Sequence, residues 1–308
     1  MPETRVAFVT GASRAIGKAT AIALATAGLD VVITARTVRE GEGVDDSDAE
    51  GRSVPGSLET TAALIEERGR RALPLTMDLL DRASLEAVVG RALDECGRID
   101  VLVNNAVHTG PGSMARFDDT TVEMIETKLA ANVVAQVVLV KLALPGMVDH
   151  GEGTIVNVTS AVAVNDPPAP AGEGGWGAAY AMSKGAFHRL AGILAVELGP
   201  RGVRVFNVEP GFVLTERMEV NQRALGLEGV YPGRAALGAG GGGGVARDRS
   251  RSRRAQRPDD LGTEVRARAR SARRLAGGPG PARKIERVLV WRRVRTKDLQ
   301  AWRAGSPS

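Results

Sequence analysis

Cysteine and aromatic residues are scarce in this sequence. Of its 308 residues, one is Cys (Cys96) and 3% are Phe, Trp or Tyr. A single thiol cannot form a disulfide within the chain, which favours a reducing compartment. The 43% of hydrophobic residues are still enough for a sizeable core, built mainly from aliphatic and alanine side chains.

Sequence features of secreted and membrane proteins are missing too. The first residues, MPETRVAFVTG, lead straight into an apolar strand pattern and lack the charged start, apolar run and cleavage site of a signal peptide. No uninterrupted apolar run approaches ~18 residues, so no membrane-spanning helix is expected. Together these absences predict a cytoplasmic protein.

The net charge of +5 is unevenly distributed along the chain. Residues 1–229 hold 21 Lys and Arg against 30 Asp and Glu, a net charge of −9, whereas residues 230–308 hold 20 against 6, a net charge of +14. A basic segment can bind nucleic acid. No aromatic residue stands between Tyr231 and Trp291 to stack on bases, however, so nucleic acid is not expected as a partner.

A strand pattern, a glycine-rich turn and a helix pattern open the chain. Residues 6–9 are apolar, Thr10-Gly-Ala-Ser-Arg-Ala-Ile-Gly17 follows, and apolar residues then recur at helical spacing up to Gly28. In this context Gly11 permits a tight turn, and Gly17 permits close packing where the N–H groups of the helix face a pyrophosphate. The pattern predicts a dinucleotide site, and the alternative is a purely structural turn.

The second predicted strand, residues 29–34, is followed by an arginine and not by an acid. An acid at this point bonds the ribose 2′-hydroxyl of NAD(H), whereas an arginine accommodates the 2′-phosphate of NADP(H). Arg36 and Arg14 together could bracket that phosphate. We therefore expect NADP(H) in preference to NAD(H), the alternative being that Arg36 is merely solvated. The acidic stretch 38–57 is expected to be a mobile loop.

Short apolar strands and helices alternate along the rest of the body. Strands are predicted over 72–77, 99–103, 154–159 and 203–208, and helices over 58–69, 84–96 and 121–145. This alternation predicts one doubly wound, Rossmann-like α/β domain, a parallel sheet with helices on both faces. Asp78, after the third strand, either bonds an adenine amino group or caps the next helix, a role for which Ser84 competes.

Tyr180 and Lys184 are four residues apart and so share one face of a helix. An ammonium beside a phenol lowers the phenol's pKa and makes it a usable acid and base, although such a pair alone is more often a plain surface helix. Ser160 stands at the carboxyl end of the 154–159 strand, where doubly wound sheets bind ligands.

Seven features in order resemble the short-chain dehydrogenase/reductase family over about residues 4–220. They are TGASRAIG, Asp78, NNA at 104–106, Asn132, Ser160, YAMSK at 180–184 and the PG-x-V-x-T segment at 210–215. The resemblance implies an NAD(P)-dependent oxidoreductase that interconverts a small-molecule carbonyl and a secondary alcohol.

The resemblance also implies roles for individual residues. Tyr180 would be the general acid in reduction and the general base in oxidation, Lys184 would lower its pKa and bond the nicotinamide ribose, Ser160 would polarise the carbonyl, and Asn132 would hold a water of a proton relay. The implied cofactor groove, in which Val213 and Thr215 hold the carboxamide, is formed by Gly11, Ser13, Arg14, Ile16, Gly17, Arg36, Asp78, Leu79, Asn104, Ala106, Tyr180, Lys184, Pro210, Gly211, Val213 and Thr215.

Some features depart from the family pattern. Ser160 and Tyr180 are 20 residues apart, a longer gap than usual, and the extra Pro/Gly loop is expected beside the substrate mouth. Val107 stands where the family has Gly. The substrate pocket is expected from residues 162–178 and 214–228. No metal-ligand spacing is present, and His108 and His188 are interpreted as structural or surface residues.

The C-terminal segment departs furthest. Residues 230–308 are rich in Gly and Arg, without amphipathic period, and are predicted to be a disordered tail after an NAD(P)-binding domain at 1–229. Codons for VARDRSRSRRAQRPDDLGTEVRA can be chosen so that the next frame reads WLATDPDRAALNGRTISAQKFA, which resembles a family C-terminus. Residues from about 233 on are therefore hypothesised to be a frameshift product.

The loss of the family's last helix and strand has functional consequences. The family implies a homo-oligomer, and this loss argues against one here. It also leaves a second hypothesis open: a catalytically impaired relative that at most binds nucleotide, or that associates through its basic tail.

Overall fold

The computed structural model describes residues 4–46, 51–224 and 234–235. Six parallel strands form one sheet in the order β3-β2-β1-β4-β5-β6. Its strands are β1 (Val6–Thr10), β2 (Asp30–Ala35), β3 (Ala72–Thr76), β4 (Val101–Asn104), β5 (Gly153–Val158) and β6 (Val203–Val208). The predicted doubly wound parallel sheet is confirmed.

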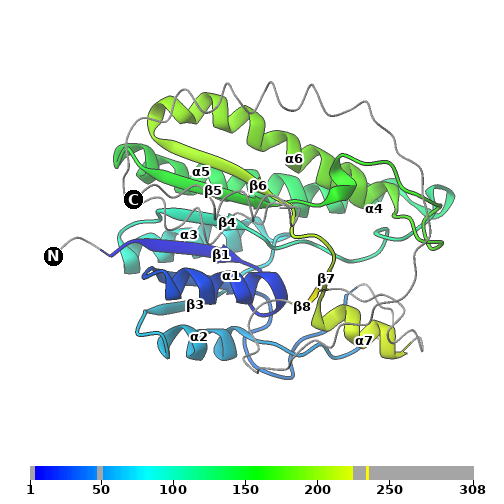
Figure 1. The fold of residues 1–308 in the computed structure, drawn as a ribbon, viewed down its shortest axis with the longest axis horizontal. Helices are drawn as coiled ribbons and strands as arrows, with labels where there is room; N and C mark the ends of the chain where they lie inside the picture. Colours follow the sequence, from blue (N-terminus) through cyan, green and yellow to red (C-terminus); the bar gives the residue numbers. More distant parts are fainter. Residues whose placement is uncertain (1–3, 47–50, 225–233, 236–308) are drawn as a thin grey trace, which may run out of the picture.

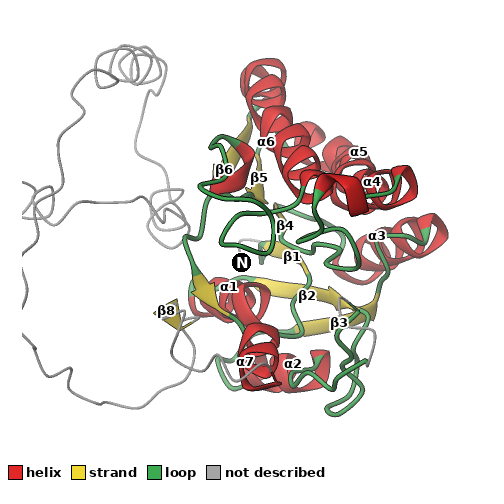
Figure 2. Cartoon of the chain, turned by 90° about the vertical axis from the view of Figure 1, so that its right-hand side faces the viewer, coloured by secondary structure: helices red, strands yellow, loops and turns green. Residues whose placement is uncertain are grey.

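Helices cover both faces of this sheet (Figures 1 and 2). One apolar cluster packs β1 and β2 against α1 (Ala15–Thr26) and α2 (Leu58–Glu66). The other packs the sheet against α3 (Arg82–Cys96), α5 (Ala135–Asp149) and α6 (Ala178–Leu198). Strands β1 and β4 are buried at every position, as expected of interior strands in a parallel sheet.

The helix predicted over 121–145 is interrupted. It consists of α4 (Val122–Leu129), a π-helical turn (Ala130–Val134) and α5, and Asn132 lies in the π turn. Such turns widen the backbone ladder and are frequent at functional sites. By length and hydropathy, residues 122–149 could span a membrane, but half of the apolar window is buried inside the protein, as in a core helix.

The far edge of the described sheet has little cover. β6 is its last strand, and Phe206 on β6 is 39% exposed. Beyond it, a two-residue strand β7 (Val213–Leu214) precedes α7 (Glu216–Ala224), and Arg234–Ala235 (β8) pair in parallel with β7. The rest of the segment 230–308, with its disorder and frameshift hypotheses, lies outside the described residues.

The acidic stretch after β2 packs more closely than the sequence predicts. Val44 and Ser53 form an antiparallel bridge, and the Asp45 side chain is fully buried. Asp45 and Asp46 find partners on α7 and on the loop after β4, so this part of 38–57 packs against the body, whereas Arg39, Glu40 and Glu42 are exposed.

Candidate active site

A groove of about 450 Å³ opens at the carboxyl ends of the strands. Topology explains this location, because the strand order reverses between β1 and β4, and a doubly wound sheet leaves a crevice at the carboxyl ends of the strands at this switch point. All the predicted site residues line this groove except Asn104 and Asn132. The predicted residues in the lining are Gly11, Ser13, Arg14, Ile16, Gly17, Arg36, Asp78, Leu79, Ala106, Ser160, Tyr180, Lys184, Pro210, Gly211, Val213 and Thr215.

The glycine-rich turn between β1 and α1 forms the floor of the groove. Gly11 has φ of +66°, and a Cβ on Gly17 would stand 2.1 Å from the carbonyl oxygen of Gly11. Gly11 is therefore required for its left-handed backbone conformation, and Gly17 for its close approach to the Gly11 carbonyl. Ala15 also lies in the left-handed region, at φ +47°.

The N-terminus of α1 already holds an anionic group. The backbone N–H of Ala15 donates to Glu216 Oε1 of α7 at 3.2 Å. The other carboxylate oxygen, Oε2, is buried without a hydrogen-bond partner among the described residues. A carboxylate here occupies the position in which a helix N-terminus binds phosphate, so the turn fits a nucleotide pyrophosphate.

Two neighbouring asparagines stand at the end of β4, Asn104 and Asn105, and the second one faces the groove. Asn104 is buried, and its Nδ2 donates to Asn157 Oδ1 at 3.0 Å inside the sheet. Asn105 lines the groove and donates to the carbonyl oxygens of Thr10 and Gly11. Asn104, which was predicted in the cofactor groove, is not among the lining residues, because as the last residue of β4 it is buried inside the sheet.

Ser160, Tyr180 and Lys184 meet in the same groove. Ser160 follows β5, while Tyr180 and Lys184 lie one turn apart on α6. The Lys184 amine donates to the carbonyl oxygen of Val158 at 2.9 Å, which ties α6 to the end of β5. The amine also stands 5.8 Å from the centre of the Phe187 ring.

Burial shifts the pKa of two of these three residues, Tyr180 and Lys184. Burial raises the pKa of the Tyr180 phenol, and the hydrogen bond with the Ser160 side chain offsets part of the rise. Burial also lowers the pKa of Lys184 to about 8. The sequence predicts a Tyr180 pKa lowered by Lys184, and the direction here is the opposite, because desolvation disfavours the phenolate.

Asn132 supports the groove from behind. Its Oδ1 accepts from the backbone N–H of His108 at 2.7 Å, and its Nδ2 donates to Ser183 Oγ at 3.1 Å. It thus joins the π turn, the loop after β4 and α6. The water relay that the family resemblance implies for Asn132 stays a prediction.

A buried lysine fixes the same loop after β4. The Lys128 side chain is fully buried, and its amine donates to the carbonyl oxygens of His108 and Gly110 at 3.1 and 2.6 Å and to Ser113 Oγ at 2.8 Å. Desolvation lowers the pKa of Lys128 to about 8. The role of Lys128 could not be predicted from the sequence, since a lysine inside an amphipathic helix pattern gives no sign of being buried.

The two arginines expected to bracket a 2′-phosphate have separate partners. Arg14 donates to Thr37 Oγ1 and to the carbonyl oxygens of Val54, Pro55 and Gly56. Arg36 is half exposed and forms an ion pair of 2.9 Å with Asp46. Arg14 is therefore a support for the loop before α2, and Arg36 alone has a charged partner at the end of β2.

Asp78 lines the groove without capping α3. Its Oδ1 accepts from the backbone N–H of Leu80, while the side chain of Asp81 accepts from the N–H groups of Ala83 and Ser84. Asp81 is the helix cap, so both alternatives considered from the sequence, Asp78 and Ser84, are wrong for that role.

Other groove residues were not predicted from the sequence. His108 lines the groove, and His188 Nδ1 lies 3.2 Å from Thr159 Oγ1. The structural or surface role expected for both histidines stays a prediction. No residue of 162–178 is in the lining, because Gly177 N–H ties this loop to the Ser113 carbonyl. The lining residues that were not predicted are Ala15, Ala35, Thr37, Met77, Asn105, Val107, His108, Thr109, Val158, Thr159 and Phe212, while Arg217 and Met218 belong to the segment 214–228 that was expected at the substrate pocket.

These features define an α/β oxidoreductase of the dinucleotide-binding class, and comparisons with known proteins agree. The family model described as "short chain dehydrogenase" matches residues 49–225. An uncharacterized NAD-dependent oxidoreductase of Mycobacterium tuberculosis is 34% identical over 216 residues, which cover 70% of this chain and 74% of that protein.

Solved structures show the same relationship. A short chain dehydrogenase from Mycobacterium paratuberculosis bound to NAD is 30% identical, with a TM-score of 0.59 over 73% of this chain and 80% of that one. L-sorbose reductase from Gluconobacter frateurii, complexed with NADPH and L-sorbose, is 27% identical, with a TM-score of 0.60 over 74% and 77%. The chain belongs to the short-chain dehydrogenase/reductase family, whose members are NAD(P)-dependent enzymes.

Proposed function

We propose that this protein interconverts a carbonyl and a secondary alcohol by hydride transfer, with NADP(H) as the preferred cofactor and Tyr180 as the acid and base. The convergence of Ser160, Tyr180 and Lys184 on the groove that also contains the glycine-rich turn carries this proposal. A phosphate site and a proton donor in one groove are what such a reaction requires.

The residues of the groove fit a nicotinamide dinucleotide. The turn from Gly11 to Gly17 would hold its pyrophosphate, as the carboxylate of Glu216 on the Ala15 N–H supports. Asp78 and Leu79 would contact the adenine end, and Val213 and Thr215 the carboxamide. The nicotinamide supplies the hydride in reduction and accepts it in oxidation.

The trio handles the proton at the substrate oxygen. Ser160 Oγ donates a hydrogen bond to the carbonyl oxygen, and the Tyr180 hydroxyl delivers a proton to it as negative charge develops. In the opposite direction Tyr180 takes the proton of the alcohol. Lys184, held on the Val158 carbonyl, contributes a positive charge beside the phenol while it is protonated.

The preference for NADP(H) rests on one guanidinium. Arg36 follows β2 directly and lines the groove, and no acid stands beside it in the sequence. Arg14 is held by backbone carbonyls and contributes to the shape of the site more than to phosphate binding. The interpretation therefore depends on Arg36 alone.

Tyr180→Phe tests the mechanism. The variant keeps the ring and loses the titrating hydroxyl, so turnover should fall by roughly 10²–10⁴-fold while NADPH binding persists. The substrate comes from a screen of ketones and secondary alcohols with NADPH and NADP⁺. Full turnover by Tyr180→Phe would show that the mechanism is wrong.

The exposed edge at β6 favours a second candidate, a catalytically impaired relative that at most binds nucleotide or associates through its basic tail. β6 is the edge strand of the sheet among the described residues, and its Phe206 is 39% exposed. Thermal melting with and without NADPH tests the cofactor groove: a shift supports an intact groove, and no shift together with salt-sensitive retention on DNA supports the tail hypothesis. Turnover in the substrate screen then separates an enzyme from a relative that only binds nucleotide. The cytoplasmic location and the absence of a homo-oligomer stay predictions.

A further inference from the structure

Asp46 places a carboxylate on the guanidinium that would bind a 2′-phosphate. Its Oδ2 accepts from Arg36 Nη2 at 2.9 Å, ten residues along the chain. In NAD(H)-binding sites the usual acid is the residue that follows β2 directly. Asp46 lies ten residues further along the chain, in the loop after β2, but its side chain reaches the same end of β2. Any ligand that binds the Arg36 guanidinium therefore competes with the Asp46 carboxylate for it.

Backbone pairing positions this carboxylate. The Asp45 N–H donates to the Arg52 carbonyl at 2.8 Å, and the Val54 N–H donates to the Gly43 carbonyl at 2.9 Å. Residues 43–46, here called the strap, are thereby held beside residues 52–54. Asp46 directly follows Asp45, the last residue of this backbone pairing, so the backbone helps to hold it in place.

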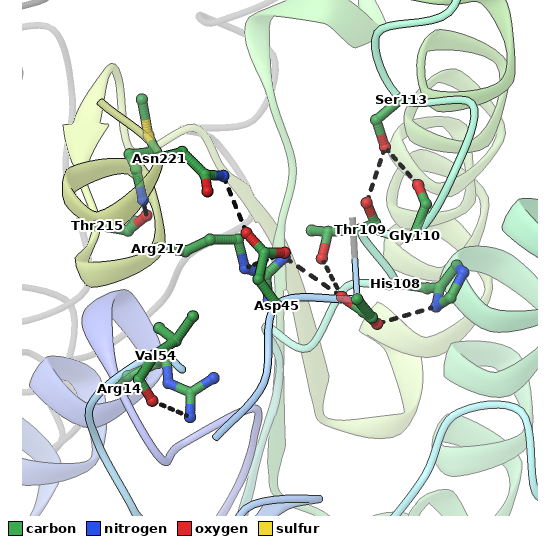
Figure 3. A network of polar contacts seen from close by, with 12 residues as sticks. Arg14, Asp45, Val54, His108, Thr109, Gly110, Ser113, Thr215, Arg217 and Asn221 are labelled. Carbon is green, nitrogen blue, oxygen red and sulfur yellow. Dashed lines mark hydrogen bonds and ion pairs between the residues drawn. The ribbon is translucent and has the colours of Figure 1, made fainter. Parts of the chain in front are cut away.

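The strap is held from two further sides (Figure 3). From α7, Asn221 Nδ2 donates to Asp45 Oδ2 at 2.9 Å, and Arg217 lies 3.5 Å from Asp45 Oδ1 and 3.8 Å from Asp46 Oδ1. From the loop after β4, Thr109 Oγ1 donates to Asp46 Oδ1 at 3.0 Å. The Asp46 carboxylate thus contacts three residues of the groove lining: Arg36 after β2, Arg217 of α7 and Thr109 of this loop.

The charge of Asp46 persists at neutral pH. Burial raises the pKa of its carboxyl, but Arg36, Arg217 and the Thr109 hydroxyl together lower it more, so the net shift is downward. His108 Nδ1 also faces this carboxylate, at 3.8 Å. The Asp46 carboxylate would repel a phosphate dianion on Arg36, whereas it would not repel a ribose hydroxyl, which carries no charge.

We propose that Asp46 sets the selectivity between NADP(H) and NAD(H), by holding Arg36 in an ion pair that the 2′-phosphate must displace. Asp46 then limits the preference for NADP(H) that Arg36 confers. The inference rests on the proposed function, because it takes the groove to be the dinucleotide site.

Calorimetric titration of the full chain with adenosine 2′,5′-bisphosphate and with 5′-AMP tests this role. Asp46→Asn keeps the size of the side chain and removes the charge, so it should tighten the bisphosphate by about tenfold and 5′-AMP by less than about twofold. Glu42→Gln removes one charge from the same loop without touching Arg36, and it should leave the ratio of the two affinities unchanged.

The last control introduces Asp46→Asn into a protein that already carries Arg36→Met. Without the Arg36 guanidinium, Asp46→Asn should leave the ratio of the two nucleotide affinities unchanged. Asp46→Ser provides a second neutral substitution if the first one lowers folding yield. An unchanged ratio in the neutral variants, or weaker 5′-AMP binding from loss of a contact to the ribose, would overturn the role of Asp46. Failure of both nucleotides to bind the wild-type chain would overturn the dinucleotide site itself, and with it the proposed function.

Discussion

The amine of Lys184 lies 2.9 Å from the carbonyl oxygen of Val158 and joins α6 to the end of β5. This bond fixes the face of α6 that carries Tyr180, one turn earlier, toward the groove. Lys184 is buried and Tyr180 is partly buried, and this desolvation raises the pKa of Tyr180 and lowers that of Lys184 to about 8. The protonation state of the pair should therefore decide which direction of the reaction is fast.

Reduction and oxidation should respond differently to pH. Reduction uses the protonated phenol, and a Tyr180 pKa above its ordinary value of 10.0 keeps this form dominant through neutral pH. Oxidation uses the phenolate, whose fraction grows by up to about tenfold per pH unit below that pKa. We expect a level rate of carbonyl reduction from about pH 6 to 8 and a rising rate of alcohol oxidation from about pH 7 to 9.

Initial rates in both directions over this range check the expectation, with kcat separated from KM. Above about pH 8 reduction should decline as Lys184 loses its proton. A rate of oxidation that is level or falls between about pH 7 and 9 would contradict the raised pKa of Tyr180.

Glu216 should weaken the binding of both cofactors equally. Its carboxylate accepts from the Ala15 N–H at the N-terminus of α1, where the pyrophosphate common to NADPH and NADH is expected. Glu216→Gln removes the competing charge, so the affinity for both should rise by the same factor, about three- to tenfold. Fluorescence titration with NADPH and NADH measures it.

The matched control for this prediction is Glu219→Gln. Glu219 lies in the same first turn of α7 but is exposed, and its substitution should leave both affinities unchanged. An equal gain from both substitutions would assign the effect to overall charge and not to the contact with Ala15.

The parallel sheet, the glycine-rich turn and most of the groove could be predicted from the sequence because they depend on local patterns. Apolar runs mark strands, and the carboxyl ends of parallel strands meet at one edge, so Ser160 and Tyr180 could be placed there. Which of Asn104 and Asn105 faces the groove could not be predicted, because a strand end uncertain by one residue reverses the face of each side chain.

The strap could not be predicted, because its contacts join distant parts of the chain. Asn221 and Asp45 are 176 positions apart, and Thr109 and Asp46 are 63 apart. Composition indicates an acidic, glycine-rich loop there, and such loops are mostly solvated. Only the tertiary arrangement brings Arg217 of α7 and the loop after β4 to these carboxylates.

Ala15→Gly should stabilise the protein. Ala15 holds φ of +47°, a conformation that costs an L-residue about 1 kcal/mol and glycine nearly nothing. The gain in free energy of unfolding should approach that value, as measured by urea denaturation. Ala19→Gly, inside α1, is the control and should destabilise by about 0.5–1 kcal/mol. A less stable Ala15→Gly variant would show that the Ala15 methyl group contributes packing that outweighs the strain.

Lys128 should make stability depend on pH. Its pKa is lowered from 10.5 in the unfolded chain to about 8 in the folded protein, so between these values the unfolded state binds more protons. The contribution of Lys128 to stability therefore rises with pH across that window and is lowest below about pH 8. Methionine cannot titrate. The free energy of unfolding of Lys128→Met should therefore fall relative to that of the wild-type protein as the pH rises from about 8 to 10.

The difference in free energy of unfolding between wild type and variant isolates this residue, since Lys184 and Tyr180 titrate in both proteins. Lys141→Met removes an exposed lysine from α5 and is the control for the loss of one positive charge. If the Lys128→Met difference does not change with pH, the amine keeps its proton throughout on the carbonyls of His108 and Gly110. Those acceptors would then outweigh desolvation, and Lys128 would be a permanently charged clamp on the loop after β4.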